Sequence, residues 1–374
     1  MYPKGTLADW LGDRVVYRNL APADSGLPCL SDVWREIGLE AYRVPRKTEP
    51  AYAAAVMRFL EAAQAARGAL PLRSLLFVGD TFMNDGTAAG NLAAHLPLRG
   101  FIGDDRLGEP DQAQVDGLLL VATRWARVAE LPAWAHEQGL ACDERMALLV
   151  DVDKTFIGAR GRNDGVIDGA RVAAVRQTVE ELMGDKFDEP SFRAVYDVLK
   201  QQKYHYFTAD NQDYLAYMCL MVAGGVFPAE ELWAELGAGR LSGFTQFVTL
   251  CDARRGRMGE GLTLAHREVT ANMRRGDPTP FKSFRYREYL ATVARMDCLP
   301  DETPRGDILK QEIVITDEVA QLVRRLADMG VLTFGISDKP DEASLPTQVL
   351  AEQGKPPLHR ARMKIVGPIY GGEG

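Results

Sequence analysis

Six short aliphatic runs, separated by segments with helical periodicity, constrain the fold of this chain more than any other feature. The runs are SLLFVG (74–79), RGFIG (99–103), DGLLLVA (116–122), MALLVDV (146–152), VLTFGI (331–336) and RMKIVG (362–367). Apolar residues recur at three- and four-residue intervals in 51–66 and 317–330, which is typical of amphipathic helices. Because such alternation is typical of a mostly parallel sheet covered by helices, we predict an α/β fold.

The pattern changes between about residues 160 and 310, where Tyr, Met, Leu and charged residues recur at helical spacing with Gly and Pro breaks. We predict a separate, mainly helical domain over 160–310, inserted into a core made of 41–159 and 311–374. The length of 374 residues agrees with two domains. Residues 1–40 match no element of this plan and are interpreted as an N-terminal extension of unknown role.

Composition argues against several kinds of partner. The formal net charge of −8 disfavours nucleic acid and anionic membrane surfaces. The longest apolar run, 214–227, is shorter than the ~20 residues needed to cross a bilayer, and the N-terminus lacks the pattern of a signal peptide. The five cysteines are scattered and form no C-x-x-C pair, which indicates reduced thiols. We expect a cytoplasmic protein without nucleic-acid or membrane contacts, and the sequence leaves open whether it is a homodimer.

Two carboxylates follow one of the aliphatic runs. In MALLVDVDKT (146–155) the expected strand ends at Asp151, and Asp153 lies two residues further on. In a displacement reaction, one carboxylate of such a pair can attack the substrate as a nucleophile while the other transfers a proton. Taken alone, however, Asp-x-Asp is more often a turn that ends a strand.

Two further strand ends carry polar residues. LLFVGDTFMNDG (75–86) ends in Asp80 and Asp85, and clustered carboxylates suit Mg²⁺, although a glycine-rich turn explains this stretch as well. VLTFGI is followed by Ser337, whose hydroxyl can donate a hydrogen bond to a phosphoryl oxygen. A serine at a strand end is, by itself, more often a helix cap.

Together these stretches resemble the haloacid dehalogenase superfamily, whose members are mostly Mg²⁺-dependent phosphatases and phosphotransferases. The resemblance implies a Rossmann-like parallel core with a cap domain inserted after the first motif, here DVDKT. It makes Asp151 the residue that is phosphorylated, Asp153 the general acid and base, and Ser337 the second-motif hydroxyl. The metal ligands that it implies are Asp80, Asp85, Asp151 and Asp153, with Asp85 either a direct ligand or a support.

The family's motif order is changed in this chain, because the fourth motif at Asp80 precedes the first. The family places a lysine at the start of the helix before the fourth-motif strand, and Lys47 has that position within 46–80. Lys339 is the alternative phosphate-binding lysine, but the spacing to Asp80 favours Lys47. The order third, fourth, first, second is a circular permutation, with the break expected between RMKIVG and the Lys47 helix.

These assignments predict a Mg²⁺-dependent phosphatase that hydrolyses a small phosphorylated metabolite through an aspartyl phosphate. A phosphotransferase or mutase would use the same residues, and a non-catalytic binding protein of this fold is the alternative from another class. No organic cofactor is expected. The candidates for substrate contacts from the cap are Arg160, Arg162, Lys203, Tyr204 and His205. Taken alone, such arginines are more often solvated surface, and such aromatic residues are more often helical core.

Overall fold

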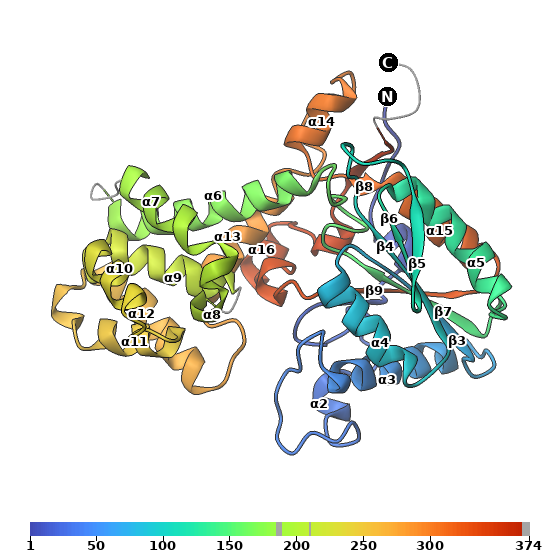
Figure 1. Ribbon diagram of the computed structural model, residues 1–374, viewed down its shortest axis with the longest axis horizontal. Coiled ribbons are helices and arrows are strands. Elements are labelled where there is room, and N and C mark those ends of the chain that lie inside the picture. Colours follow the sequence, from blue (N-terminus) through green and yellow to red (C-terminus); the bar gives the residue numbers. More distant parts are fainter. Residues whose placement is uncertain (185–188, 209–210, 369–374) are drawn as a thin grey trace. The chain divides into compact units, whose positions relative to one another are not determined.

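The computed structural model describes residues 1–184, 189–208 and 211–368 (Figure 1). It divides into two compact units. The sheet unit contains Met1–Gly169 and the chain from Thr292 onward, and the helical unit contains Ala170–Ala291. The inserted unit is therefore narrower than the expected 160–310, because the residues at both ends of that range pack with the sheet unit.

A seven-stranded sheet forms the centre of the sheet unit. Its strands, in spatial order, are β2 (Val15–Val16), β9 (Leu332–Ile336), β7 (Met146–Asp151), β3 (Ser74–Gly79), β4 (Leu98–Gly103), β6 (Leu119–Ala122) and β5 (Ala113–Asp116). All neighbours are parallel except β5, which is antiparallel to β6. The predicted α/β fold with a mostly parallel sheet is confirmed, and the arrangement is compatible with a Rossmann-like core.

Helices cover both faces of this sheet (Figure 1). One face carries α3 (Pro50–Ala66) and α4 (Thr87–Ala93), and the other carries α5 (Leu131–Glu137) and α15 (Asp317–Asp328). Successive side chains of a strand point to opposite faces, so Phe77 packs in the core beneath α3 while Val78 packs in the core beneath α15. Burial on both faces explains why β3 and β7 are continuous apolar runs in the sequence.

A second, three-stranded sheet corrects one expectation. It consists of β1 (Lys4–Gly5), β10 (Met363–Val366) and β8 (Ile315–Thr316), so RMKIVG lies outside the main sheet. The strand beside β9 is instead β2, which comes from the N-terminal residues. The first forty residues, which also form α1 (Ala8–Leu11) and α2 (Leu30–Val33), thus contribute a strand to each sheet.

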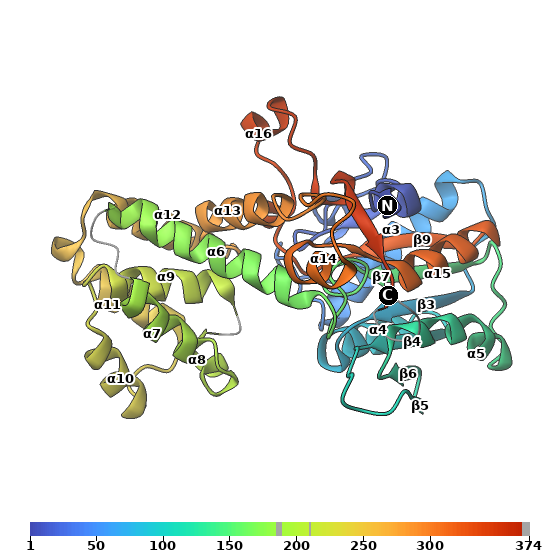
Figure 2. The same ribbon diagram turned by 90° about the horizontal axis from the view of Figure 1, so that it is seen from above.

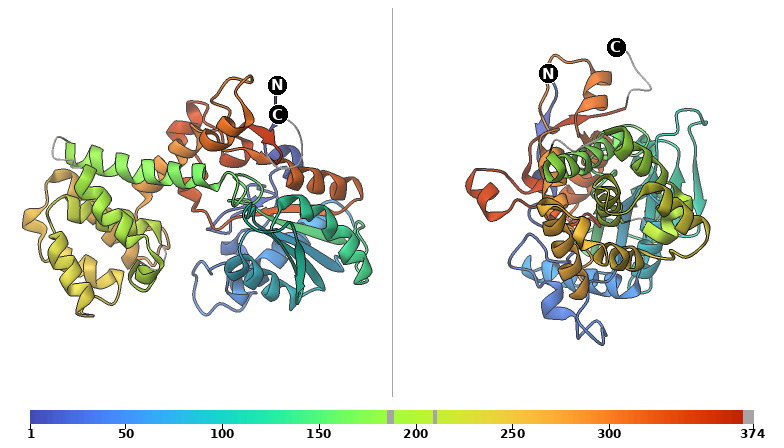
Figure 3. Two further views of the ribbon diagram at one scale, coloured as in Figure 1. Left: turned by 45° about the horizontal axis from the view of Figure 1, so that its top comes forward. Right: turned by 90° about the vertical axis from the view of Figure 1, so that its left-hand side faces the viewer.

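The described part of the helical unit consists of helices (Figures 2 and 3). They are α6 (Asp164–Met183), α7 (Glu189–Leu199), α8 (His205–Thr208), α9 (Gln212–Ala223), α10 (Ala229–Gly237), α11 (Phe244–Asp252), α12 (Glu260–Arg274) and α13 (Lys282–Val293). They have a hydrophobic core of their own, in which α9 is almost entirely buried. No helix among the described residues of the whole chain has the length and apolar character to span a membrane.

The sheet unit also contains the short helices α14 (Arg305–Gln311) and α16 (Gln348–Glu352). α14 precedes β8, and α16 lies between β9 and β10. All five cysteines are free thiols.

Candidate metal centre

Three buried aspartates meet at the carboxyl edge of the main sheet. Asp151 ends β7, Asp80 follows β3, and Asp85 lies in the π-helical turn η1 (Phe82–Gly86) that comes next. One carboxylate oxygen from each lies within 4.8 Å of the others. Because β3 and β7 are adjacent and parallel, their carboxyl ends lie side by side. Buried carboxylates at this spacing can hold a metal ion.

Asp85 is oriented by the turn that follows β3. Its Oδ2 accepts hydrogen bonds from the backbone N–H of Asp80 at 3.1 Å and of Thr81 at 2.9 Å, and from Thr81 Oγ1 at 2.9 Å. A Cβ on Gly79 would lie 2.5 Å from Asp85 Cβ, so the turn has room for the carboxylate only with glycine there. Thr81 was not among the residues predicted from the sequence, although threonine is a residue type that commonly caps the start of a helical turn.

Lys47 joins two of the aspartates. Its ammonium donates to Asp85 Oδ1 and to Asp151 Oδ1, both at 2.5 Å, and its side chain is only 5% exposed. Helix α3 begins at Pro50, so Lys47 lies in the turn before the helix and does not open it. The structure thus brings Lys47 to the aspartates, while Lys339 lies beside another acid.

The close packing of these groups shifts their pKa values. Burial raises the pKa of Asp151 well above its usual range, and the nearby Lys47 offsets only part of that effect. Burial and the charge of Asp85 raise the pKa of Asp80 to about 7. Burial opposes ionisation of Asp85 too, but the charge of Lys47 and several hydrogen bonds prevail and lower its pKa to about 2. Burial and mutual repulsion thus disfavour the ionised forms of Asp80 and Asp151 in the metal-free protein, and a bound cation would favour those ionised forms.

Arg160 contacts the third aspartate. Its Nε donates to Asp80 Oδ2 at 2.6 Å, and both residues belong to the sheet unit. Arg162 is buried in the same loop, where it pairs with Asp105 at 2.7 Å and with Glu318 at 2.7 Å. The two arginines expected in a cap domain therefore lie in the sheet unit, where Arg160 belongs to the carboxylate centre and Arg162 anchors its loop.

Asp153 and Ser337 lie near the same edge, outside the carboxylate group. Asp153 is 22% exposed, and its carboxylate lies 3.9 Å from the ammonium of buried Lys339. Ser337 follows β9, where its Oγ accepts from Lys339 N at 3.1 Å and its N–H donates to Val16 O at 2.9 Å. Since β9 neighbours β7, the serine follows a strand end adjacent to that of Asp151. The group of possible metal ligands found among the described residues does not include Asp153.

The remaining candidates lie in the helical unit. Lys203 is exposed, and Tyr204 is half-buried with its ring 6.3 Å from that of Trp233. Tyr204 and Trp233 also line a hollow of about 380 Å³ within this unit. The side chain of His205 lies outside those that the structure describes. The prediction that this unit covers the centre and selects a substrate stays a prediction.

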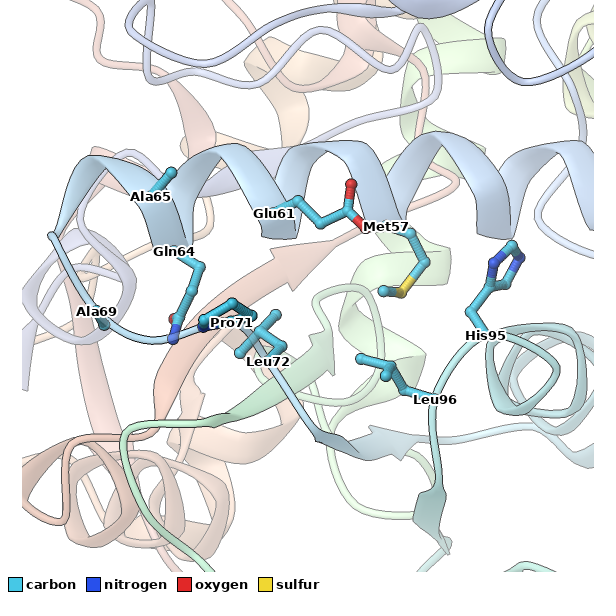
Figure 4. Close-up of a pocket in the computed structure, with 9 residues that line it drawn as sticks. All are labelled: Met57, Glu61, Gln64, Ala65, Ala69, Pro71, Leu72, His95 and Leu96. Atoms are coloured by element: carbon cyan, nitrogen blue, oxygen red, sulfur yellow. The ribbon is translucent and has the colours of Figure 1, made fainter.

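A pocket of about 410 Å³ lies at the other edge of the sheet, between α3 and the loops that lead into β3 and β4 (Figure 4). It is lined by Met57, Glu61, Gln64, Ala65, Ala69, Pro71, Leu72, His95 and Leu96. Leu72 and Leu96 precede the amino ends of their strands, whereas Asp80 follows a carboxyl end. The pocket therefore belongs to a different part of the sheet unit from the carboxylate centre.

The centre combines three functions that a displacement at phosphorus requires. It has a buried carboxylate, a place for a cation and a lysine that neutralises charge. No protein-family model matches the sequence, and neither the curated proteins nor the solved structures include a significant match.

Proposed function

We propose that the protein is a Mg²⁺-dependent phosphatase that acts on a small phosphomonoester through a phosphorylated Asp151. The observation that carries this proposal is the buried contact of Lys47 with Asp151 and Asp85, with Asp80 beside them. Three carboxylates buried around a lysine lower the stability of the metal-free protein, which makes a functional role the better explanation.

Mg²⁺ fits the donor set of this centre. It prefers carboxylate oxygens as protein ligands. One carboxylate oxygen from each of Asp80, Asp85 and Asp151 lies within 4.8 Å of the others, so the three side chains could share one cation. These residues would hold the ion, and bound Mg²⁺ would offset the repulsion between a carboxylate nucleophile and a phosphate dianion.

The chain's own residues then supply the reaction steps. A carboxylate oxygen of Asp151 attacks phosphorus, and the bond to the ester oxygen breaks as Asp153 gives its proton to the leaving alkoxide. Asp153 then takes a proton from water, whose oxygen attacks phosphorus and releases Asp151 and inorganic phosphate. Lys47 orients Asp151, and its ammonium carries three N–H donors, of which two reach aspartates. Partial exposure of Asp153 agrees with its exchanging protons with water.

The strand order supports a permuted haloacid dehalogenase arrangement. The strands that end at Ser337, Asp151 and Asp80 are the consecutive neighbours β9, β7 and β3, so these motifs share one edge whatever their order along the chain. On this proposal β2 takes the place expected of RMKIVG, since it lies parallel to β9 and precedes Lys47 in the chain. The break in the family's order then falls between β9 and β2.

The proposal is tested by phosphate release from p-nitrophenyl phosphate and from a panel of sugar, nucleotide and organic-acid phosphates, with Mg²⁺ or with EDTA. We expect turnover that needs the metal, is abolished by Asp151→Asn, and is retained by the control Asp116→Asn, which changes an exposed acid of β5.

An added alcohol acceptor separates the phosphotransferase alternative, because a transferase passes the phosphoryl group to the alcohol in preference to water. A folded protein that binds Mg²⁺ but releases no phosphate from any ester contradicts the phosphatase proposal.

A further inference from the structure

Arg160 differs from the other cation of the centre in its access to solvent. The Arg160 side chain is 32% exposed, whereas Lys47 is 5% exposed, although both contact buried aspartates. The ion pair with Asp80 uses the Nε–H of Arg160, and a guanidinium carries four more N–H donors on its terminal nitrogens. A single side chain thus connects the buried carboxylates to the solvent-accessible side of the centre.

The backbone of Arg160 is held firmly from both sides. Its N–H donates to Lys154 O at 2.8 Å, and its carbonyl accepts from Asp105 N at 3.1 Å and from Trp125 Nε1 at 3.0 Å. The next residue, Gly161, has φ +74°, and a Cβ there would lie 2.4 Å from Asp105 O. The loop is therefore fixed at this point, and only the long side chain of Arg160 is left to move between partners.

Arg160 adds one positive charge to the centre. When all three carboxylates are ionised, they carry a formal charge of −1 together with Lys47 and Arg160, and a bound divalent cation would make it +1. Without Arg160 the loaded centre would be neutral. A positive, partly desolvated centre attracts a phosphate dianion, and a guanidinium matches phosphate oxygens with two parallel N–H donors.

We propose that Arg160 exchanges partners: it pairs with Asp80 in the metal-free protein and turns to a phosphoryl oxygen of the substrate when a divalent cation binds Asp80. This inference rests on the proposed function and adds a substrate-binding residue to it. The partner exchange makes phosphate binding depend on prior metal binding, because only the metal releases the guanidinium from its carboxylate.

Isothermal titration calorimetry tests the exchange with Mg²⁺ alone and then with inorganic phosphate at saturating Mg²⁺. For Arg160→Gln we expect Mg²⁺ affinity equal to or above that of the wild type, because a competing cation is gone. We expect phosphate affinity to fall by about 10- to 100-fold, as for a lost hydrogen bond to a charged group. The control Arg106→Gln removes an exposed arginine that pairs with Asp104 and should change neither affinity.

Weaker Mg²⁺ binding in Arg160→Gln with unchanged phosphate affinity would overturn the proposal, since Arg160 would then only position Asp80. Phosphate affinity that is the same with and without Mg²⁺ in the wild type would overturn it as well.

Different results would contradict the phosphatase function and the partner exchange of Arg160. If the wild type hydrolyses esters but Arg160→Gln binds phosphate normally, the partner exchange alone is refuted. If no ester is hydrolysed but the phosphate affinity still depends on Mg²⁺ and on Arg160, the exchange stands and the phosphatase function does not.

Discussion

Replacing Lys47 with methionine should destabilise the metal-free protein and make its stability strongly dependent on Mg²⁺. Lys47 is 5% exposed and donates to Asp85 and Asp151 at 2.5 Å. At this distance and an effective dielectric constant of about 20, each contact contributes about 7 kcal/mol of Coulomb attraction, which is largely offset by the cost of desolvating the ions.

Truncating one partner of such a buried network typically costs about 3–5 kcal/mol, because the remaining charges lose their counterion. We therefore expect the free energy of unfolding of Lys47→Met in EDTA at pH 8 to fall by about 3–5 kcal/mol. Mg²⁺ supplies the missing positive charge, so the variant should gain more stability from Mg²⁺ than the wild type gains.

Urea denaturation followed by circular dichroism, with EDTA or with Mg²⁺, measures both effects. The matched control is Lys364→Met, because Lys364 is a buried lysine that pairs with Glu312 at 2.9 Å and Asp297 at 3.1 Å in the region of the small sheet. It should lose comparable stability, and Mg²⁺ should not restore that loss. Equal recovery of both variants in Mg²⁺, or no recovery of Lys47→Met, would refute the view that Lys47 occupies a cation-binding centre.

Two further predictions concern the glycine before the turn that follows β3 and the buried side chain of His359. Gly79→Ala should displace the Asp85 carboxylate and cost about 1–3 kcal/mol of stability along with Mg²⁺ affinity, whereas Gly90→Ala, in open space on α4, should be neutral or stabilising. Calorimetry and thermal melts check this, and unchanged Mg²⁺ binding by Gly79→Ala would contradict it. Burial lowers the pKa of His359 below its usual 6.5 despite the nearby Asp13, so the unfolded chain binds a proton at this histidine more readily, and His359 should contribute a loss of stability as the pH drops below about 6.5. His359→Gln should weaken that dependence in urea titrations at pH 7.5 and 5.5, and an unchanged slope would contradict the assignment.

The local pattern of the sequence was sufficient for five of the seven strands of the main sheet. Five of the six aliphatic runs form strands of that sheet, because a strand buried on both faces needs an apolar residue at nearly every position. The same pattern places Asp80 and Asp151 at strand ends, and parallel strands bring such ends to one edge. Residues 15 and 16 gave no such signal, since a two-residue strand is too short to show any periodicity.

The sequence by itself determined the strand ends that carry carboxylates, because that depends on the composition of each short segment. Only the tertiary structure decided which charges meet. Lys47 and Asp151 are 104 residues apart, and Arg160 and Asp80 are 80 apart. Their contacts follow from the order of β9, β7 and β3 and from loop conformations fixed by long-range hydrogen bonds. No local pattern encodes these features, because strand order depends on how the whole core is buried.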